Sequence, residues 1–193
     1  MELTLNEKYE LIKKHLIEEK GTNPIKIVKS LMHSDFINIH GPEHHFLDGA
    51  AFMKALNNTG LDFNFEESLD ILAERTIKMP GAMCGYWGMC GSTASIGAVF
   101  AIIDNTGPLS NDIHYKEHME FTSNVINKMS KIGGPRCCKR NAFLSIISGV
   151  EYANEHYNIN LELDDKIECE FSSWNKLCIG DRLKNNRFNT ILY

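Results

Sequence analysis

The sequence has 193 residues, of which 43% are hydrophobic and 23% are charged, and its formal net charge is −5. This length predicts one domain with a substantial core, and the acidic balance argues against nucleic acid as a partner. The charged, amphipathic N-terminal segment and the lack of a long apolar run argue against a secretory signal or a membrane span, so we expect a cytoplasmic protein. In a reducing compartment, six cysteines indicate metal binding, redox chemistry or buried packing rather than a disulfide scaffold.

Hydrophobic periodicity predicts a mainly α fold, a compact bundle of about six to seven helices with a short irregular or β C-terminal tail. Gly and Pro residues interrupt the periodic segments and separate the helices. We divide the chain into a helical Cys/His-rich domain, residues 1–157, and a tail, residues 158–193, packed on the domain or extending from it. The tail segment LELDDKIECEF is expected to form a short strand pair. In chain order, the expected helices span about 5–19, 24–30, 48–57, 65–79, 93–103, 112–131 and 137–156.

A histidine-rich segment, HGPEHH, occupies residues 40–45, and the Gly-Pro dipeptide places it in a loop before the third expected helix. Its letters H-x-x-E-H match an inverted zinc-protease motif, but that motif needs one continuous helix, which the dipeptide disfavours. Without the protease assignment, His40, His44 and His45 are candidate metal ligands, and Glu43 is a candidate ligand, catalytic base or partner of a ligand. Simple solvation of a surface loop explains the same residues equally well.

A glycine-rich segment, PGAMCGYWGMCGSTAS, occupies residues 80–95 and contains Cys84 and Cys90. Its glycines permit positive φ angles and close approach of the backbone to another group. Ser92 is a good N-cap for the helix that follows, so Cys90 is expected just before a helix start. Both thiols are therefore candidate metal ligands.

The segment GGPRCCKR, residues 133–140, places Cys137 and Cys138 in the first turn of the last long helix. A helix N-terminus and the adjacent Arg and Lys side chains favour thiolates, so we expect low pKa values there. Consecutive Cα atoms lie about 3.8 Å apart, too close for an unstrained disulfide. Because successive helical side chains point about 100° apart, one thiol can face the glycine-rich segment while the other faces a different partner. We expect Cys137 to ligate or attack, and Cys138 to be a second ligand or resolving thiol.

Ordinary packing is the competing interpretation for each of these residues. Any single cysteine is most often a small buried hydrophobe, but four cysteines at two Gly/Pro-flanked helix starts favour a function. Cys169 and Cys178 lack such flanks and are expected to be packing residues or weak auxiliary ligands. His114 and His118 have the one-turn spacing that suits a single metal ion, yet local packing and hydrogen bonding is the interpretation we prefer.

Together, HGPEHH, PGAMCGYWGMCG and GGPRCCKR resemble the motifs of an uncharacterised cysteine-rich family of anaerobic bacteria and archaea. Members of that family occur joined to a methyltransferase-like domain, which implies a methyltransferase or redox protein as partner. The resemblance covers roughly residues 40–150 and implies that the three motifs converge in the fold. A weaker likeness links the cysteines to small redox proteins with a C-GCAxxG-C-C pattern, although the spacing differs and the GCA triplet is missing here.

Three functions remain open from the sequence. The first is a Cys/His metal-binding protein that holds Zn²⁺ or an iron–sulfur cluster in a redox or metal-assisted catalytic role. The second is a metal-free thiol-disulfide or sulfur-transfer enzyme, in which Cys137 or Cys138 attacks and a thiol of the 84–90 segment resolves. The third is a helical interaction domain with incidental cysteines. For the first two, the motif loops should meet at one end of the bundle; the sequence assigns no oligomeric state.

Overall fold

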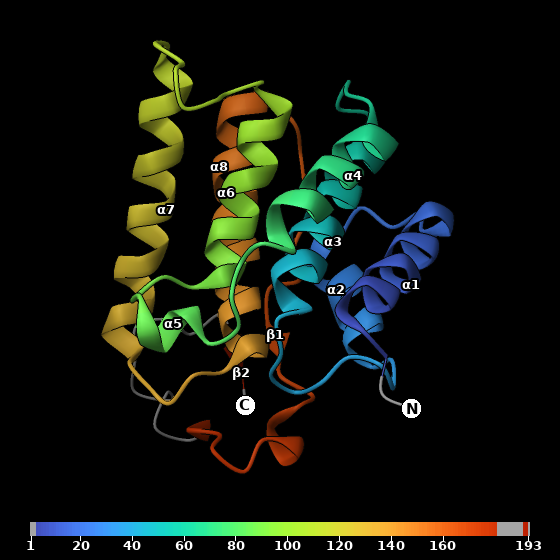
Figure 1. Cartoon of the computed structure of the whole chain (residues 1–193), viewed down its shortest axis with the longest axis vertical. Coiled ribbons are helices and arrows are strands. Elements are labelled where there is room, and N and C mark those ends of the chain that lie inside the picture. Colours follow the sequence, from blue (N-terminus) through green and yellow to red (C-terminus); the bar gives the residue numbers. More distant parts are fainter. Residues whose placement is uncertain (1–2, 181–190, 193) are drawn as a thin grey trace.

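The computed structural model describes residues 3–180 and 191–192 of the chain, and within them the protein is mainly α-helical, as predicted (Figure 1). Two short strands pair in parallel, β1 (Ile167–Glu168) with β2 (Ile191–Leu192), and a 3-10 helix, η1, spans Ser172–Trp174. The α-helices are α1 (Leu5–Glu18), α2 (Pro24–Met32), α3 (His44–Asn58), α4 (Phe65–Thr76), α5 (Met83–Tyr86), α6 (Gly91–Ile103), α7 (Ile113–Ile132) and α8 (Cys138–Tyr157).

Side-chain caps separate the helices into two groups. In each of α1, α2, α4 and α7, an N-cap side chain accepts hydrogen bonds from backbone N–H groups of the first turn. The starts of α3, α6, α8 and the short helix α5 have no side-chain cap bond. Three long helices and one short one therefore begin with first-turn N–H groups that no N-cap side chain satisfies. The caps of the first group are Thr4, Asn23, Asn64 and Asp112.

Helix α3 is the centre of the core. Every residue from His44 to Leu56 is buried, and the helix packs most extensively on α6, with α1, α2, α4 and α8 also in contact. In Figure 1, α3 runs between the α1–α2 pair and the α6–α7–α8 layer. A helix surrounded in this way needs apolar or small residues around its whole circumference, and its sequence HHFLDGAAFMKALNN largely provides them.

The contact between α3 and α6 depends on a glycine. A Cβ atom added to Gly49 would overlap the Ser95 Oγ and lie 3.2 Å from a methyl group of Leu72. A side chain at position 49 would force the Ser95 hydroxyl to turn away, and the Ser95 carbonyl oxygen, also 3.2 Å from the added Cβ, would still be crowded. The crossing of α3, α4 and α6 is therefore as close as it is because residue 49 is glycine.

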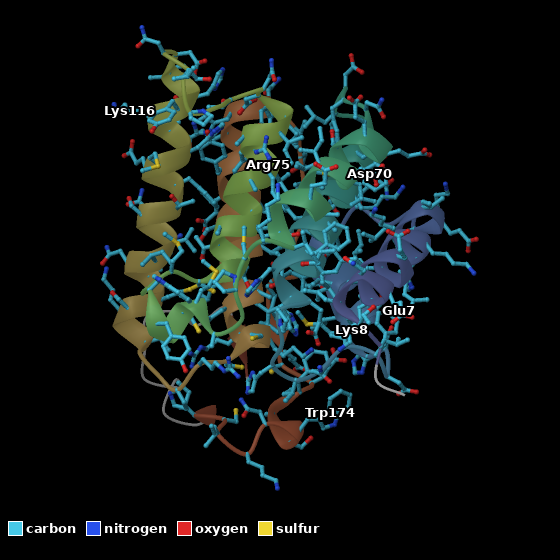
Figure 2. The ribbon with its side chains drawn as sticks, in the orientation of Figure 1. Glu7, Lys8, Asp70, Arg75, Lys116 and Trp174 are labelled. Atoms are coloured by element: carbon cyan, nitrogen blue, oxygen red, sulfur yellow. The ribbon has the colours of Figure 1, made fainter. Side chains whose placement is uncertain are left out.

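The N-terminal ends of α3, α6 and α8 lie at the same end of the bundle, the lower end in Figure 1, where α5 is also found. The tail runs past this end, and Leu161, Ile167 and Phe171 are buried in the same hydrophobic cluster as the helices. Figure 2 shows the side chain of Trp174 at this lower end. Among the described residues, no helix combines the length and the apolar character that crossing a membrane requires.

Several predicted boundaries were wrong. Helix α3 begins at His44 rather than near Asp48, because backbone bonds such as His45 N–H to Pro42 O (2.9 Å) form a turn that leads directly into it. The second and third histidines of HGPEHH are thus helical and only His40 precedes the turn. Helix α4 ends at Thr76, and a short helix, α5, lies within the glycine-rich segment expected to be a loop.

Replacing Gly49 by Ala tests the α3–α6 contact. Because the new methyl group collides with Ser95, we expect a loss of about 1 to 3 kcal/mol in the free energy of unfolding, measured by urea denaturation. Gly85→Ala is the matched control, since Gly85 lies in helix α5 and its added Cβ meets no atom within 4 Å. Equal stability of the two variants would contradict the close packing described here.

Candidate functional site

A cavity of about 250 Å³ lies at the N-terminal ends of α3, α6 and α8. It joins residues that are far apart in the sequence, such as His40 and Cys138, which are 98 residues apart. The three motifs therefore meet at one place, at the end of the bundle where the helix starts lie. The predicted site residues that line the cavity are His40, His44, His45, Cys84, Cys90, Cys137 and Cys138.

Helix starts position three of the four thiols. Cys90 is the N-cap residue of α6, Cys137 is the N-cap residue of α8, and Cys138 is the first residue of α8. The expected cap, Ser92, instead donates a hydrogen bond to the Asp48 carboxylate on α3. First-turn N–H groups and the positive ends of the helix dipoles are consequently close to the thiols.

The adjacent cysteines have different neighbours, as the helical geometry predicts. The Asn175 Nδ2 of the tail donates to the Cys137 Sγ at 3.7 Å. Cys138 instead neighbours Cys90 and the backbone of Gly41, both of which influence its pKa. Cys138 is thus the thiol directed toward the glycine-rich segment, whereas Cys137 also reaches the tail. Which of the two ligates or attacks stays a prediction.

The low pKa expected at the start of α8 is wrong for Cys138, and the pKa of Cys90 is shifted in the same direction. Burial raises the pKa of Cys138 to about 12 and also raises the pKa of Cys90. Backbone N–H groups near Cys90 and the Asn141 amide, whose Nδ2 donates to the Cys90 Sγ at 3.5 Å, act in the opposite direction but do not prevail. In protein without a bound cation, desolvation of these thiols outweighs the helix dipole.

His44 belongs to a buried polar network and has both ring nitrogens occupied. Its Nδ1 is 3.3 Å from the Asp48 Oδ1, and its Nε2 is 3.1 Å from the Lys139 Nζ. Lys139 also donates to the Asn38 carbonyl at 3.1 Å and lies over the Phe171 ring. Although His44 lines the cavity, its Nδ1 is committed to Asp48 within α3 and its Nε2 to Lys139 of α8, which does not support its predicted role as a ligand.

Lys139 and Asp48 are site residues that the sequence reasoning missed. Lys139 is 1% exposed, and burial lowers its pKa to about 8, while the Asp48 charge acts to raise it. Asp48 accepts from Ser92 and faces His44, so the network joins the starts of α3, α6 and α8. The i, i+4 spacing of His44 and Asp48 was a usable signal once α3 is known to begin at His44.

The other two histidines keep more freedom to bind a ligand. The Nδ1 of His45 is buried and has no hydrogen-bond partner among the described residues. Burial lowers the pKa of this imidazole, against the backbone of Met79, which acts to raise it. Its ring lies directly against Gly91, where an added Cβ would overlap it. His40 makes only long contacts, from its Nε2 to the Asn175 Oδ1 at 3.3 Å and from its Nδ1 to the Cys138 N–H at 3.5 Å. His45 is thus the best available nitrogen donor of the motif.

Glu43 does not line the cavity. Its carboxylate pairs with the Lys8 Nζ at 3.3 Å and accepts from the Asn38 N–H at 2.8 Å. The absence of a side chain at Gly41 leaves the room that this carboxylate occupies. These contacts tie α1 to the start of α3. A catalytic role for Glu43 stays a prediction that its placement does not support.

A larger cavity of about 650 Å³ adjoins the first. Cys84 and Cys90 line both cavities and so form part of the boundary between them. The other shared lining residues are Ala82, Arg136 and Asn141. Tyr86 of the α5 helix lines the larger cavity and is 78% exposed. A substrate or a partner protein can therefore approach the thiols from this side.

The cavity is too wide for a compact ligand set. Among the His, Cys, Asp and Glu side chains of the described residues, Asp104, His114 and His118 alone bring three ligand atoms within 4.8 Å of one another. The cysteines and histidines of the cavity surround a common space without meeting this condition. Any group that they hold together must be larger than one ion, or the side chains must move.

One comparison with known proteins identifies the family. The profile of the family of unknown function DUF5714 matches residues 12–184. The chain belongs to DUF5714. The match covers the helical part and most of the tail, so in this DUF5714 protein the tail is part of the family's shared sequence. No curated protein and no solved structure matches the chain.

Thiol reactivity tests the pKa directions. Iodoacetamide reacts with the thiolate, so raised pKa values leave little reactive thiolate on Cys90 and Cys138 at pH 8. In metal-free DUF5714 protein, we expect both to be alkylated more than about tenfold more slowly than in urea-unfolded protein, with rates that rise toward alkaline pH. Peptide mass spectrometry measures each site. Labelling of either thiol at the unfolded rate would contradict its burial.

Proposed function

We propose that this DUF5714 protein binds an iron–sulfur cluster in the 250 Å³ cavity and uses it in a redox or metal-assisted reaction. The observation that carries the proposal is that four cysteines from two distant segments line one cavity at three helix starts. Cys84, Cys90 and Cys138 are the proposed ligands, and Cys137 or His45 is the fourth.

The spacing of the ligand atoms favours a cluster over a single zinc ion. Zn–S bonds of about 2.3 Å place the sulfur atoms of a tetrahedral site about 3.8 Å apart. No three Cys or His ligand atoms of the cavity lie within 4.8 Å of one another. In a [4Fe–4S] cluster, each thiolate binds a different iron, so the sulfur atoms surround a wider space. Zinc remains the alternative if the side chains close on an ion.

The charges around the cavity favour the same conclusion. Several thiolates bound to iron give a centre with net negative charge, which the uncapped starts of α3, α6 and α8 stabilise through their N–H groups. Arg136 lines the cavity, and buried Lys139 follows Cys138 directly. A bound cation would also offset the burial that raises the pKa of Cys90 and Cys138, because metal ligation requires the thiolate.

The metal-free thiol enzyme has less support. A nucleophilic thiol needs a lowered pKa, whereas burial raises the pKa of Cys90 and Cys138. If the cluster transfers electrons, a redox partner protein must reach it. We propose that this partner approaches the cavity from the face beside α5, where Tyr86 and Trp87 are exposed. We also propose a methyltransferase as the alternative partner and the cytoplasm as the location of the protein.

Anaerobic reconstitution with iron and sulfide tests the proposal. We expect a broad absorbance near the blue end of the visible spectrum, with iron and sulfide bound in equal amounts per chain. Cys84→Ser, Cys90→Ser and Cys138→Ser should each lose most of this absorbance and of the bound iron, because each removes a thiolate ligand. Iron, sulfide and absorbance are measured on the same samples.

Cys169 and Cys178 supply matched controls, since neither lines the cavity. Burial raises the pKa of Cys169, and the charges of nearby Cys137 and Cys178 raise it further, so the tail thiols are close to the site without being part of it. Cys169→Ser and Cys178→Ser should keep the wild-type iron content. Reconstituted protein that binds no iron but holds zinc through sulfur ligands, lost in the three cavity Cys→Ser variants, would replace the cluster by the zinc alternative. Protein whose cavity cysteines bind neither metal would refute both.

A further inference from the structure

We propose a second metal site in this protein, for a divalent transition ion such as Zn²⁺, formed by Asp104, His114 and His118. One ligand atom of each lies within 4.8 Å of the others. Two imidazoles and a carboxylate are a common donor set for zinc and similar ions. The proposal does not depend on the cysteine cavity.

The geometry of the three side chains comes from two helix ends. Asp104 is the C-cap residue of α6, and the two histidines lie one turn apart in the first turns of α7. The Asp104 Oδ2 is 2.8 Å from the His118 Nε2 and 3.9 Å from the His114 Nδ1. Ligand atoms of a tetrahedral zinc site lie about 3.4 Å apart, which is between these two distances. Small side-chain movements are sufficient for an ion to enter.

Neighbouring residues hold the carboxylate and offer a further donor. The Tyr157 hydroxyl donates to the Asp104 Oδ2 at 2.9 Å, the kind of contact that orients a metal ligand. The Glu117 Oε2 lies 3.4 Å from the His114 Nδ1 and can supply another oxygen. A simple His–Asp hydrogen bond would involve only two side chains. Here a second histidine, the Tyr157 hydroxyl and the Glu117 carboxylate are also in place, as a metal site requires.

The negative charge of the Asp104 and Glu117 carboxylates also favours binding of a cation. No Lys or Arg side chain of the described residues lies within 4 Å of the Asp104 or Glu117 carboxylate, whose nearby basic groups are histidines. A divalent ion bound to neutral imidazoles would balance two carboxylates.

The site is accessible and far from the cysteine cavity. The Asp104 and His118 side chains are 10% and 8% exposed, but that of His114 is 44% exposed and gives solvent a route to the ligands. Figure 2 labels Lys116, which lies between the two histidines in sequence, at the upper end of α7, opposite Trp174. The thirteen residues of α6 separate the two sites by about 20 Å.

Zinc binding to the full chain tests the proposal. We expect His114→Ala and the shape-conserving Asp104→Asn to weaken binding of one zinc ion per chain about 100-fold or more, and Tyr157→Phe about tenfold. Equilibrium dialysis measures the affinities. Zinc-edge X-ray absorption should show that the lost ion has nitrogen and oxygen ligands while any sulfur-bound zinc is unchanged.

His15→Ala is the matched control, since His15 is an exposed histidine on α1 away from the three residues. It should bind zinc as the wild type does. The proposal is overturned if His114→Ala and Asp104→Asn, folded by circular dichroism, bind zinc like the wild type, or if His15→Ala loses as much. Because the readout is zinc with nitrogen and oxygen ligands, a failed iron–sulfur reconstitution leaves this test intact.

Discussion

The close contact of α3 with α6 is the constraint on which the site depends. Gly49 lets α3 approach Ser95 and Leu72, and at the other end of the contact Gly91 lies against the His45 ring. A side chain at either glycine would force the Ser95 hydroxyl or the His45 ring out of its place, and close packing leaves each little room to move. This contact aligns the start of α3 with the start of α6, and so brings the HGPEHH and glycine-rich segments to the same cavity.

The buried polar network fixes the start of α8 relative to the start of α3, as the close contacts at the two glycines fix the start of α6. Asp48, His44 and Lys139 form a chain of contacts from α3 to α8, and Ser92 of α6 joins it through Asp48. Buried charges are costly unless they are paired and hydrogen-bonded, so removing any member would leave another unsatisfied. The network consequently favours one relative position of the three helix starts. It also explains why a lysine directly after the cysteine pair points inward rather than into solvent.

The two ends of α6 differ in the chemistry that they assemble. Its N-terminal end joins soft thiol donors to helix N-termini, a combination that suits negatively charged centres such as thiolate-bound iron. Its C-terminal end joins a carboxylate and two imidazoles, which suit a harder divalent ion. Both arrangements use residues at helix ends or in the first turns of helices, where donor groups from different helices can meet.

The helical class, the approximate helix limits and the residues of the three motifs followed from the sequence alone, because periodicity, glycine and proline act locally. The different directions of the Cys137 and Cys138 side chains also followed from the sequence, since successive side chains on any helix point about 100° apart. The start of α3 at His44, the inward position of Lys139 and the raised pKa values of Cys90 and Cys138 did not. Each depends on what burial and distant segments do to a side chain, and neither local spacing nor composition contains that information. The meeting of Asp104 with His114 and His118 likewise required the packing of α7 on α6.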